Sequence, residues 1–331
     1  MNPSLPAAAL AAFVAFTNGC AGIAIATAPS RNPSPSTAPA AREARRAFHR
    51  ALETGDYASL PQVTEQLTAA YLSAPNDPQT NLDLGMAHLW TVAERERNKP
   101  IPPTVIDQLT LADYYLGQAA HLSPGDARIT GFQASARMAL GSVHGDERWK
   151  RMGYFELRDA IGEYPEFNLF VLSATMIQLP QGDPGLVEAE DAIWKNLDAC
   201  LDHQVDRDHL ERLDGELRAG QSGPAESKRF RACFNSDRAP HNVEGFFLHL
   251  GDVLSKRQQP TRARVAYGLA KSSTSYATWP HAIVLEERLK NLDARTAQFR
   301  AAKTVAEEPE LTARAGYFCV SCHQRAPGGG N

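Results

Sequence analysis

The stretch "GFFLHLGDVLSKRQQPTRARVAYGLAKS", residues 245–272, shows most clearly how this chain folds. Its apolar residues recur at intervals of three and four on both sides of "RQQP", which is the spacing of helices with one buried face. Pro260 interrupts the pattern between the two runs, because proline cannot continue a helix that precedes it. The stretch therefore predicts two helices joined by a short turn.

Small and large residues follow a fixed spacing along these two helices. Leu250 and Gly251 form a Leu-Gly step in the first, and Ala263, Tyr267 and Ala270 follow Gly251 in the second at the spacings of a tetratricopeptide repeat. In that resemblance the small residues let the two helices approach closely, and the aromatic ring fills the groove beside them. The resemblance implies a helix pair that stacks on similar neighbours.

A second copy of the pattern lies earlier in the chain and is interrupted. Leu84 and Gly85 match the first helix, and an insertion containing "NKPIPP" follows. The second helix is matched by Ala112, Leu116, Ala119 and Pro124. Fainter copies occur near Leu67 and in "GFQASARMALG" around Arg137. Repeated units of this length are typical of helical arrays.

The rest of the region agrees with this interpretation. Between residues 43 and 305 no long alternating pattern of strands appears, and turn signals such as "LSPGDA" and "LPQGDPG" recur at short intervals. We therefore predict an all-α fold, a TPR-like helical-repeat solenoid over 43–305 followed by a C-terminal helix. An unrelated all-α bundle is the alternative.

The N-terminus, "MNPSLPAAALAAFVAFTNGC", resembles an export signal. Its apolar run over 7–16 is shorter than the ~20 residues of a transmembrane helix but suits a signal-peptide core, although no Lys or Arg precedes it. Gly19-Cys20 resembles a lipoprotein processing box, which predicts a signal peptide over 1–20 and a lipid on Cys20. Secretion without lipid, after cleavage near Ala26, and a cytosolic location remain alternatives.

The Pro-, Ser- and Ala-rich residues that follow predict a disordered linker over 21–42. Such a tether suits a domain that is held to a membrane by a lipid on Cys20. The prediction is therefore an exported protein of the periplasm or cell envelope.

Two cysteines in the middle of the chain, Cys200 and Cys233, predict a disulfide in an oxidising compartment. Closing that loop would stabilise the fold by ~3 kcal/mol in the chain-entropy model. Two unpaired thiols are the alternative.

The C-terminal residues 315–331, "AGYFCVSCHQRAPGGGN", contain the order C-x-x-C-H at Cys319, Cys322 and His323. Two cysteines three positions apart lie on neighbouring positions of a helical turn, where their thiols can add to the two vinyl groups of a porphyrin. The following histidine can then ligate the iron. A redox dithiol and a zinc site are alternatives, but no strand precedes the motif and no second cysteine pair accompanies it.

The segment "GYFCVSCHQ" resembles the attachment helix of c-type cytochromes. The resemblance implies one covalent haem c on Cys319 and Cys322, an axial bond from His323 to its iron, and an attachment segment over 306–331. In the common cytochrome c fold a Met ligand and packing helices follow the motif, and here they do not. Residues upstream must therefore cover the haem.

In a solenoid, neighbours in sequence are neighbours in space, so we expect the last helices before the motif to cover it. His281 is then the first candidate for a ligand on the other side of the iron, ahead of His241 and His249. Trp279 and Tyr317 could pack on the porphyrin or belong to the core. The motif itself is expected to lie outside the repeat core.

The net charge and the motifs of the chain limit the classes of function that we expect. The net charge of −4 without a basic block disfavours nucleic acid as a partner. The favoured hypothesis is a monohaem electron carrier whose repeat scaffold docks a redox partner, with a membrane contact through the lipid. The alternative is an envelope lipoprotein that binds other proteins without haem. A peroxidase-like haem enzyme ranks third, since no distal catalytic group is evident.

Overall fold

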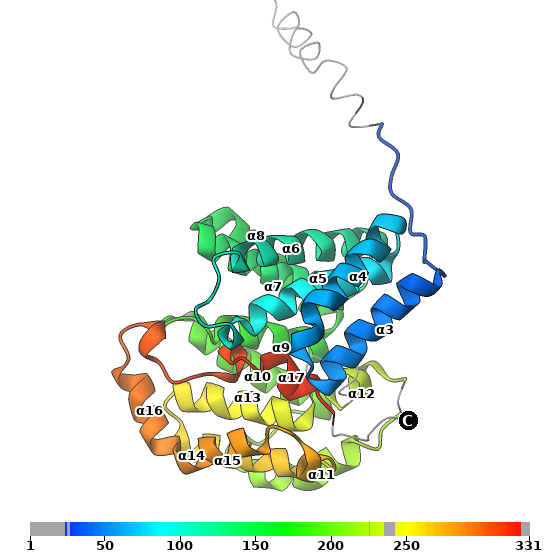
Figure 1. Cartoon of the computed structure of the whole chain (residues 1–331). Coiled ribbons are helices and arrows are strands. Elements are labelled where there is room, and N and C mark those ends of the chain that lie inside the picture. Colours follow the sequence, from blue (N-terminus) through cyan, green and yellow to red (C-terminus); the bar gives the residue numbers. More distant parts are fainter. Residues whose placement is uncertain (1–23, 25–26, 225, 235–241, 326–331) are drawn as a thin grey trace, which may run out of the picture. The chain divides into compact units, whose positions relative to one another are not determined.

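The computed structural model describes residues 24, 27–224, 226–234 and 242–325. The described residues from Ser34 onward form one compact unit, which contains fifteen α-helices and no strand (Figure 1). The predicted all-α class is confirmed. The α-helices are α3 (Pro39–Thr54), α4 (Leu60–Ser73), α5 (Pro78–Ala93), α6 (Val105–Leu122), α7 (Ala127–His144), α8 (Glu147–Glu163), α9 (Pro165–Met176), α10 (Gly185–Leu201), α11 (Asp214–Gly220), α12 (Lys228–Cys233), α13 (Val243–Lys256), α14 (Pro260–Leu269), α15 (Ala282–Lys290), α16 (Leu292–Ala301) and α17 (Phe318–His323). Short 3-10 helices are η1 (Tyr57–Ser59), η2 (Arg95–Arg97), η3 (Leu210–Leu213), η4 (Ala270–Ser272), η5 (Tyr276–Thr278), η6 (Val305–Glu307) and η7 (Thr312–Arg314).

Helices that follow each other in the chain pack in pairs. The pairs are α3 with α4, α5 with α6, α7 with α8, α9 with α10 and α13 with α14. Figure 1 shows the first four pairs following one another from blue to green. This is a helical-repeat arrangement, as the spacing of small and large residues predicted.

The Leu-Gly steps explain how the pairs fit together. A Cβ added to Gly85 of α5 would lie 2.8 Å from Cγ of Leu116 on α6, and one added to Gly251 of α13 would overlap the ring of Tyr267 on α14. Leu116 and Tyr267 are fully buried. The missing side chain on one helix thus admits the large side chain of its partner, which is the register that the sequence predicted.

Ala263→Trp is expected to destabilise this register. Ala263 of α14 is fully buried, so an indole there would force neighbouring side chains out of their rotamers at a cost of about 1–3 kcal/mol. Urea unfolding followed by circular dichroism measures the change. Arg264→Trp, at the exposed neighbouring position, is the control, and equal midpoints for both variants would contradict the register.

The first helix begins inside the predicted linker. Helix α3 starts at Pro39, and the backbone before it is already attached to the repeat, since Ser34 N donates a hydrogen bond of 2.8 Å to Asn76 O. Arg45 also donates to Ser36 O at 3.3 Å. The ordered unit is therefore longer than 43–305 at this end. Cys20 lies outside the described residues.

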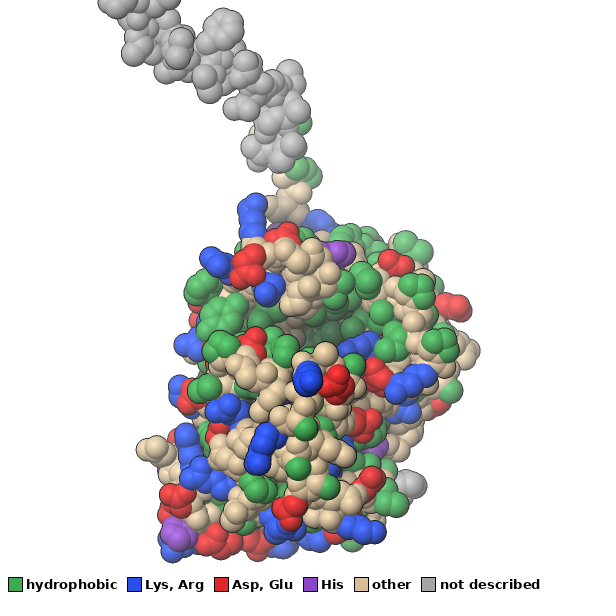
Figure 2. Space-filling view, turned by 90° about the vertical axis from the view of Figure 1, so that its left-hand side faces the viewer, with side chains coloured by type: hydrophobic (Ala, Val, Ile, Leu, Met, Phe, Trp, Pro, Cys, Tyr) green, Lys and Arg blue, Asp and Glu red, His purple; other side chains and the backbone are tan. Residues whose placement is uncertain are grey.

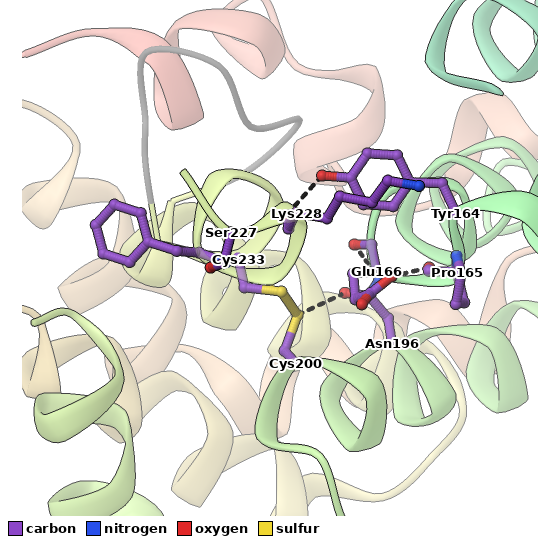
Figure 3. The surroundings of a disulfide bond; sticks show 9 residues. Tyr164, Pro165, Glu166, Asn196, Cys200, Ser227, Lys228 and Cys233 are labelled. Carbon is purple, nitrogen blue, oxygen red and sulfur yellow. Dashed lines mark hydrogen bonds between the residues drawn. A yellow bond between two sulfur atoms is a disulfide. The ribbon is translucent and has the colours of Figure 1, made fainter. Parts of the chain in front are cut away.

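The predicted disulfide is present in the structure. It joins Cys200, near the end of α10, to Cys233 at the end of α12, with the two Cα atoms 5.8 Å apart (Figure 3). The hydroxyl of Tyr164 donates to Lys228 O at 2.6 Å and holds the short helix α12 from the other side. Disulfides persist in oxidising compartments, so this bond fits a location outside the cytoplasm.

Replacing both cysteines by Ala is expected to lower the free energy of unfolding by about 3–4 kcal/mol, because the bond joins residues 33 positions apart in the unfolded chain. Urea unfolding of the wild type and of the Cys200→Ala, Cys233→Ala variant measures the loss. Dithiothreitol should bring the wild-type midpoint to that of the variant and leave the variant unchanged. A wild-type midpoint that the reductant leaves in place would contradict the prediction.

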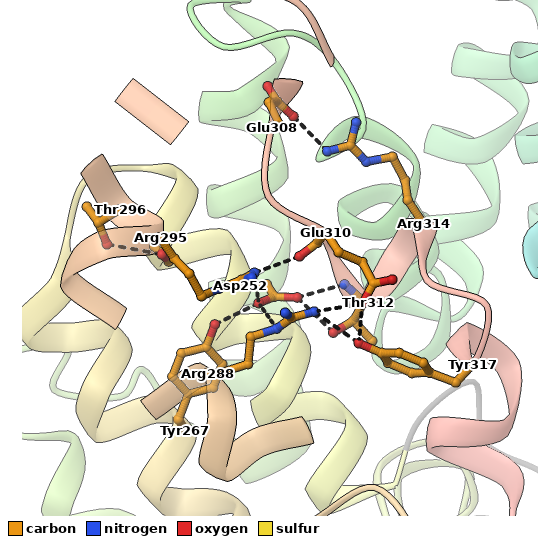
Figure 4. A network of polar contacts seen from close by, with 11 residues as sticks. Asp252, Tyr267, Arg288, Arg295, Thr296, Glu308, Glu310, Thr312, Arg314 and Tyr317 are labelled. Carbon is orange, nitrogen blue, oxygen red and sulfur yellow. Dashed lines mark hydrogen bonds and ion pairs between the residues drawn. The ribbon is translucent and has the colours of Figure 1, made fainter. Parts of the chain in front are cut away.

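The residues after α16 turn back across α13 and are fixed there by buried charges. Asp252 of α13 accepts hydrogen bonds from Thr312 N at 2.7 Å and from the Tyr267 hydroxyl at 2.6 Å (Figure 4). Lys256, one turn further along α13, pairs with Glu308 at 2.7 Å. These contacts hold the segment between α16 and α17 against α13.

None of the described helices is both long enough and apolar enough to cross a membrane.

Candidate functional site

The C-x-x-C-H motif forms α17, and this helix is buried. Val320, Ser321 and Cys322 are at most 1% exposed, and α17 packs against α3, α5 and α13. In Figure 1 it lies in the middle of the unit, drawn in red. The expectation that the motif lies outside the repeat core is therefore wrong. The residues that pack around it come from both ends of the repeat.

Polar contacts fix α17 from several directions. Val320 N, one of the helix's first amide groups, donates to the Glu94 carboxylate at 3.0 Å, so a side chain from the end of α5 caps the helix. The Trp279 indole N–H donates to Ser321 O at 2.9 Å. Arg325 N, just after the helix, donates to Glu53 O at 2.8 Å. These hydrogen bonds fix the position of α17 in the fold.

Cys319 and His323 lie one helical turn apart and both line a cavity. The cavity has a volume of about 180 Å³ and is partly open to solvent. Its other walls come mainly from α3, α5, α7 and α9, with Phe48, Trp90 and Phe170 among the lining side chains. The face shown in Figure 2 has a hollow with hydrophobic side chains in and around it. The motif thus places a thiol and an imidazole on an apolar wall.

Cys322 occupies a different part of the helix surface. A Cβ added to Gly245 on α13 would overlap its sulfur atom, so the thiol lies directly against that helix. Cys322 does not line the cavity. Of the three predicted residues, the structure therefore brings Cys319 and His323 together on the wall and places Cys322 beside α13.

Both thiols are held in the neutral form. Burial raises the pKa of Cys319 well above its usual value, and the nearby Glu94 carboxylate raises it further. Burial raises the pKa of Cys322 to about 12. A reactive dithiol needs a lowered pKa, so this environment disfavours the redox-dithiol alternative. Within the described ranges, no group of three or more His, Cys, Asp or Glu side chains is arranged for a metal ion.

Two of the histidines that the sequence suggested as second ligands, His281 and His249, are outside the cavity lining. His281 stacks on the Tyr317 ring with centroids 5.5 Å apart, and burial lowers its pKa. His249 is buried in the core 3.2 Å from the Ser173 hydroxyl, and burial lowers its pKa to about 4. Neither lines the cavity. His241 lies outside the described residues.

Sequence reasoning missed most of the cavity wall. The structure covers the motif with the early helices α3 and α5 as well as with the late helix α13, and the early helices are the part that the sequence did not suggest. Phe48, Met86 and Trp90 carry only the apolar spacing of ordinary core residues, so no signal in the sequence singled them out. Trp279 does contact the motif, through its indole N–H.

The donor set fits a haem in its chemistry. An apolar wall that carries a thiol and an imidazole on successive turns suits a flat, largely apolar group that is bound through sulfur and ligated by nitrogen. Attachment at Cys322 as well would require its thiol to leave Gly245. Comparison with protein-family models, with curated proteins and with solved structures gave no match to this chain.

Proposed function

We propose that this chain is an exported electron carrier with one covalent haem c on a TPR-like scaffold. The observation that carries the proposal is the placement of Cys319 and His323, from a C-x-x-C-H motif, on the wall of one apolar cavity. The raised pKa values of the half-buried Cys319 and the buried Cys322 support it, because they disfavour dithiol redox chemistry.

Different side chains of the protein would bind different parts of the haem. His323 would ligate the iron and Cys319 would hold the ring edge, with Cys322 as the second attachment point. Arg95 contributes a cation to the cavity lining and would pair with a carboxylate of the group. The aromatic side chains of the lining would keep water away from the bound group. When bound, the haem supplies an iron that gains and loses one electron.

The surrounding features suit a carrier in the cell envelope. The disulfide between Cys200 and Cys233 fits an oxidising compartment, and the Gly19-Cys20 step supports a lipid anchor followed by a tether. A redox partner would dock on the helical repeat near the cavity. Partitioning of the wild type and of Cys20→Ser into a detergent phase tests the anchor.

Haem staining of a denaturing gel tests the function directly. The wild type, produced with haem-maturation machinery in the periplasm, should give a stained band and a reduced-minus-oxidised spectrum of a c-type haem. Cys319→Ala with Cys322→Ala should remove the stain, as should production without that machinery. An unstained wild-type band with the machinery present would refute the proposal.

The single variants refine the test. Cys319→Ala should lose more covalent haem than Cys322→Ala, because the Cys319 thiol lines the cavity and the Cys322 thiol lies against α13. The ratio of stain to protein in each band measures the difference. Equal loss in both variants would show that Cys322 turns toward the cavity when the haem is bound.

A second candidate is a protein-binding module without haem. Exposed apolar side chains favour it: Trp149, Met152 and Phe155 on α8 are 38%, 41% and 62% exposed. Contiguous exposed apolar surface often marks a site of protein association. The same gel separates the two functions, since a binding module leaves the wild-type band unstained.

A further inference from the structure

We propose that Met86 is the second axial ligand of the haem iron, on the side opposite His323. The proposal rests on the haem attachment proposed above. Of the described side chains that line the cavity, three carry an atom that commonly bonds to iron in haem proteins: Met86, Cys319 and His323. Cys319 is used for attachment, so Met86 is the donor that remains.

The position of Met86 along α5 suits this role. It shares one face of the helix with Trp90 and Ala93, four and seven residues further on, and all three line the cavity. The next residue, Glu94, holds α17 through Val320 N. Met86 therefore lies eight residues from the point where the motif is anchored, which is ~12 Å along the helix axis. Met86 and His323 both line this cavity.

The surroundings of Met86 favour a neutral ligand. The side chain is half-buried and packs against the core cluster that includes Phe48, Trp90 and Val320. A thioether carries no charge to be desolvated there, and its unbranched chain can adjust to the iron. A histidine and a methionine together raise the reduction potential of a haem, which suits an electron carrier.

Other candidates are placed less well. His281 and His249 point into contacts outside the cavity, with Tyr317 and Ser173 respectively. Met138, on α7, packs against Gly153 of α8 and does not line the cavity. It is half-buried like Met86, which makes it a matched control for substitution.

The test compares Met86→Leu with Met138→Leu, because leucine keeps the volume of the side chain and so the packing. In the wild type we expect a low-spin oxidised spectrum with a sulfur-to-iron charge-transfer band. Met86→Leu should lose that band, shift to high spin and move to a lower midpoint potential. Met138→Leu should match the wild type. Met86→His should restore a low-spin spectrum without the sulfur band.

Haem staining of the same samples separates this proposal from the proposed function. Stained bands for every variant, together with loss of the sulfur band in Met86→Leu alone, would support it. A stained Met86→Leu protein with the wild-type spectrum, or a stained wild type that lacks the sulfur band, would overturn it while leaving the haem attachment intact. An unstained wild type would overturn both.

Discussion

Asp252→Ala is expected to destabilise the protein by about 3–5 kcal/mol, because it would leave buried cations without their counter-charge. Asp252 is 1% exposed and forms ion pairs with Arg288 at 3.3 Å and Arg295 at 3.6 Å. It also accepts hydrogen bonds from Tyr267 and from the backbone and hydroxyl of Thr312. Figure 4 shows the carboxylate at the centre of these groups. Urea unfolding measures the loss.

The effect should depend on pH in a defined direction. Burial alone would raise the pKa of Asp252, but the guanidinium groups of Arg288 and Arg295 lower it below its usual value. A lowered pKa means that the stabilisation is complete above the unfolded value of about 3.9 and is lost as the pH falls through the lower folded value. The difference between wild type and Asp252→Ala should therefore be constant near neutral pH and shrink below about pH 4.

A surface pair provides the control for Asp252. Asp191 forms an ion pair with Lys195 at 2.7 Å, and both side chains are about half exposed, so Asp191→Ala should cost well under 1 kcal/mol. An Asp252→Ala variant with the same small loss as Asp191→Ala would show that the two arginines find other partners or solvent. It would also show that the return of the chain across α13 does not depend on this carboxylate.

Glu308→Ala is expected to destabilise the protein by about 3–5 kcal/mol, because it also leaves a buried cation without its counter-charge. Its carboxylate pairs with Lys256 and with Arg314, each at 2.7 Å, and accepts a hydrogen bond from Gln181 N at 3.1 Å. The Lys256 side chain is fully buried. Removal of Glu308 therefore leaves a buried ammonium group whose remaining hydrogen bonds are to Ile177 O and Leu179 O.

Substitutions of the two partners, Lys256 and Glu308, should destabilise the protein to different extents. Lys256→Met removes the buried charge and leaves Glu308 bonded to Arg314, so it should cost less than Glu308→Ala. Adding Lys256→Met to Glu308→Ala should recover part of the loss, because a buried charge is replaced by an apolar chain. Thermal unfolding of the four proteins gives the coupling free energy. Strictly additive losses would argue against the buried pair.

The sequence predicts the helix pairs well because their signal is local. The Leu-Gly step at Leu250 and Gly251 and the ring of Tyr267 lie within one stretch of chain, and each fits the other by size alone. The disulfide was predictable from the number of cysteines. Only two remained to form a pair once Cys20 and the two cysteines of the motif were set aside.

The site was predicted only in part, because its contacts join distant residues through polar groups. Asp252 and Lys256 look like residues of a solvated helix face, and they are buried because the chain after α16 covers them. Glu94 and Val320 are 226 positions apart, and neither carries a pattern that points to the other. The motif residues were identifiable from the sequence, whereas the apolar walls opposite them were not.

The return of α17 to the first helices also changes how the chain should fold. An open repeat array makes contacts mainly between neighbours, so it can gain or lose its units one at a time. Here Gln324 donates to Thr54 O at 3.1 Å across 270 positions, which closes the array on itself. Contacts of such high order slow folding and make the units interdependent. During synthesis, α3 and α5 must therefore wait for the residues near 320 before their packing is complete, and the finished unit should melt in a single cooperative transition.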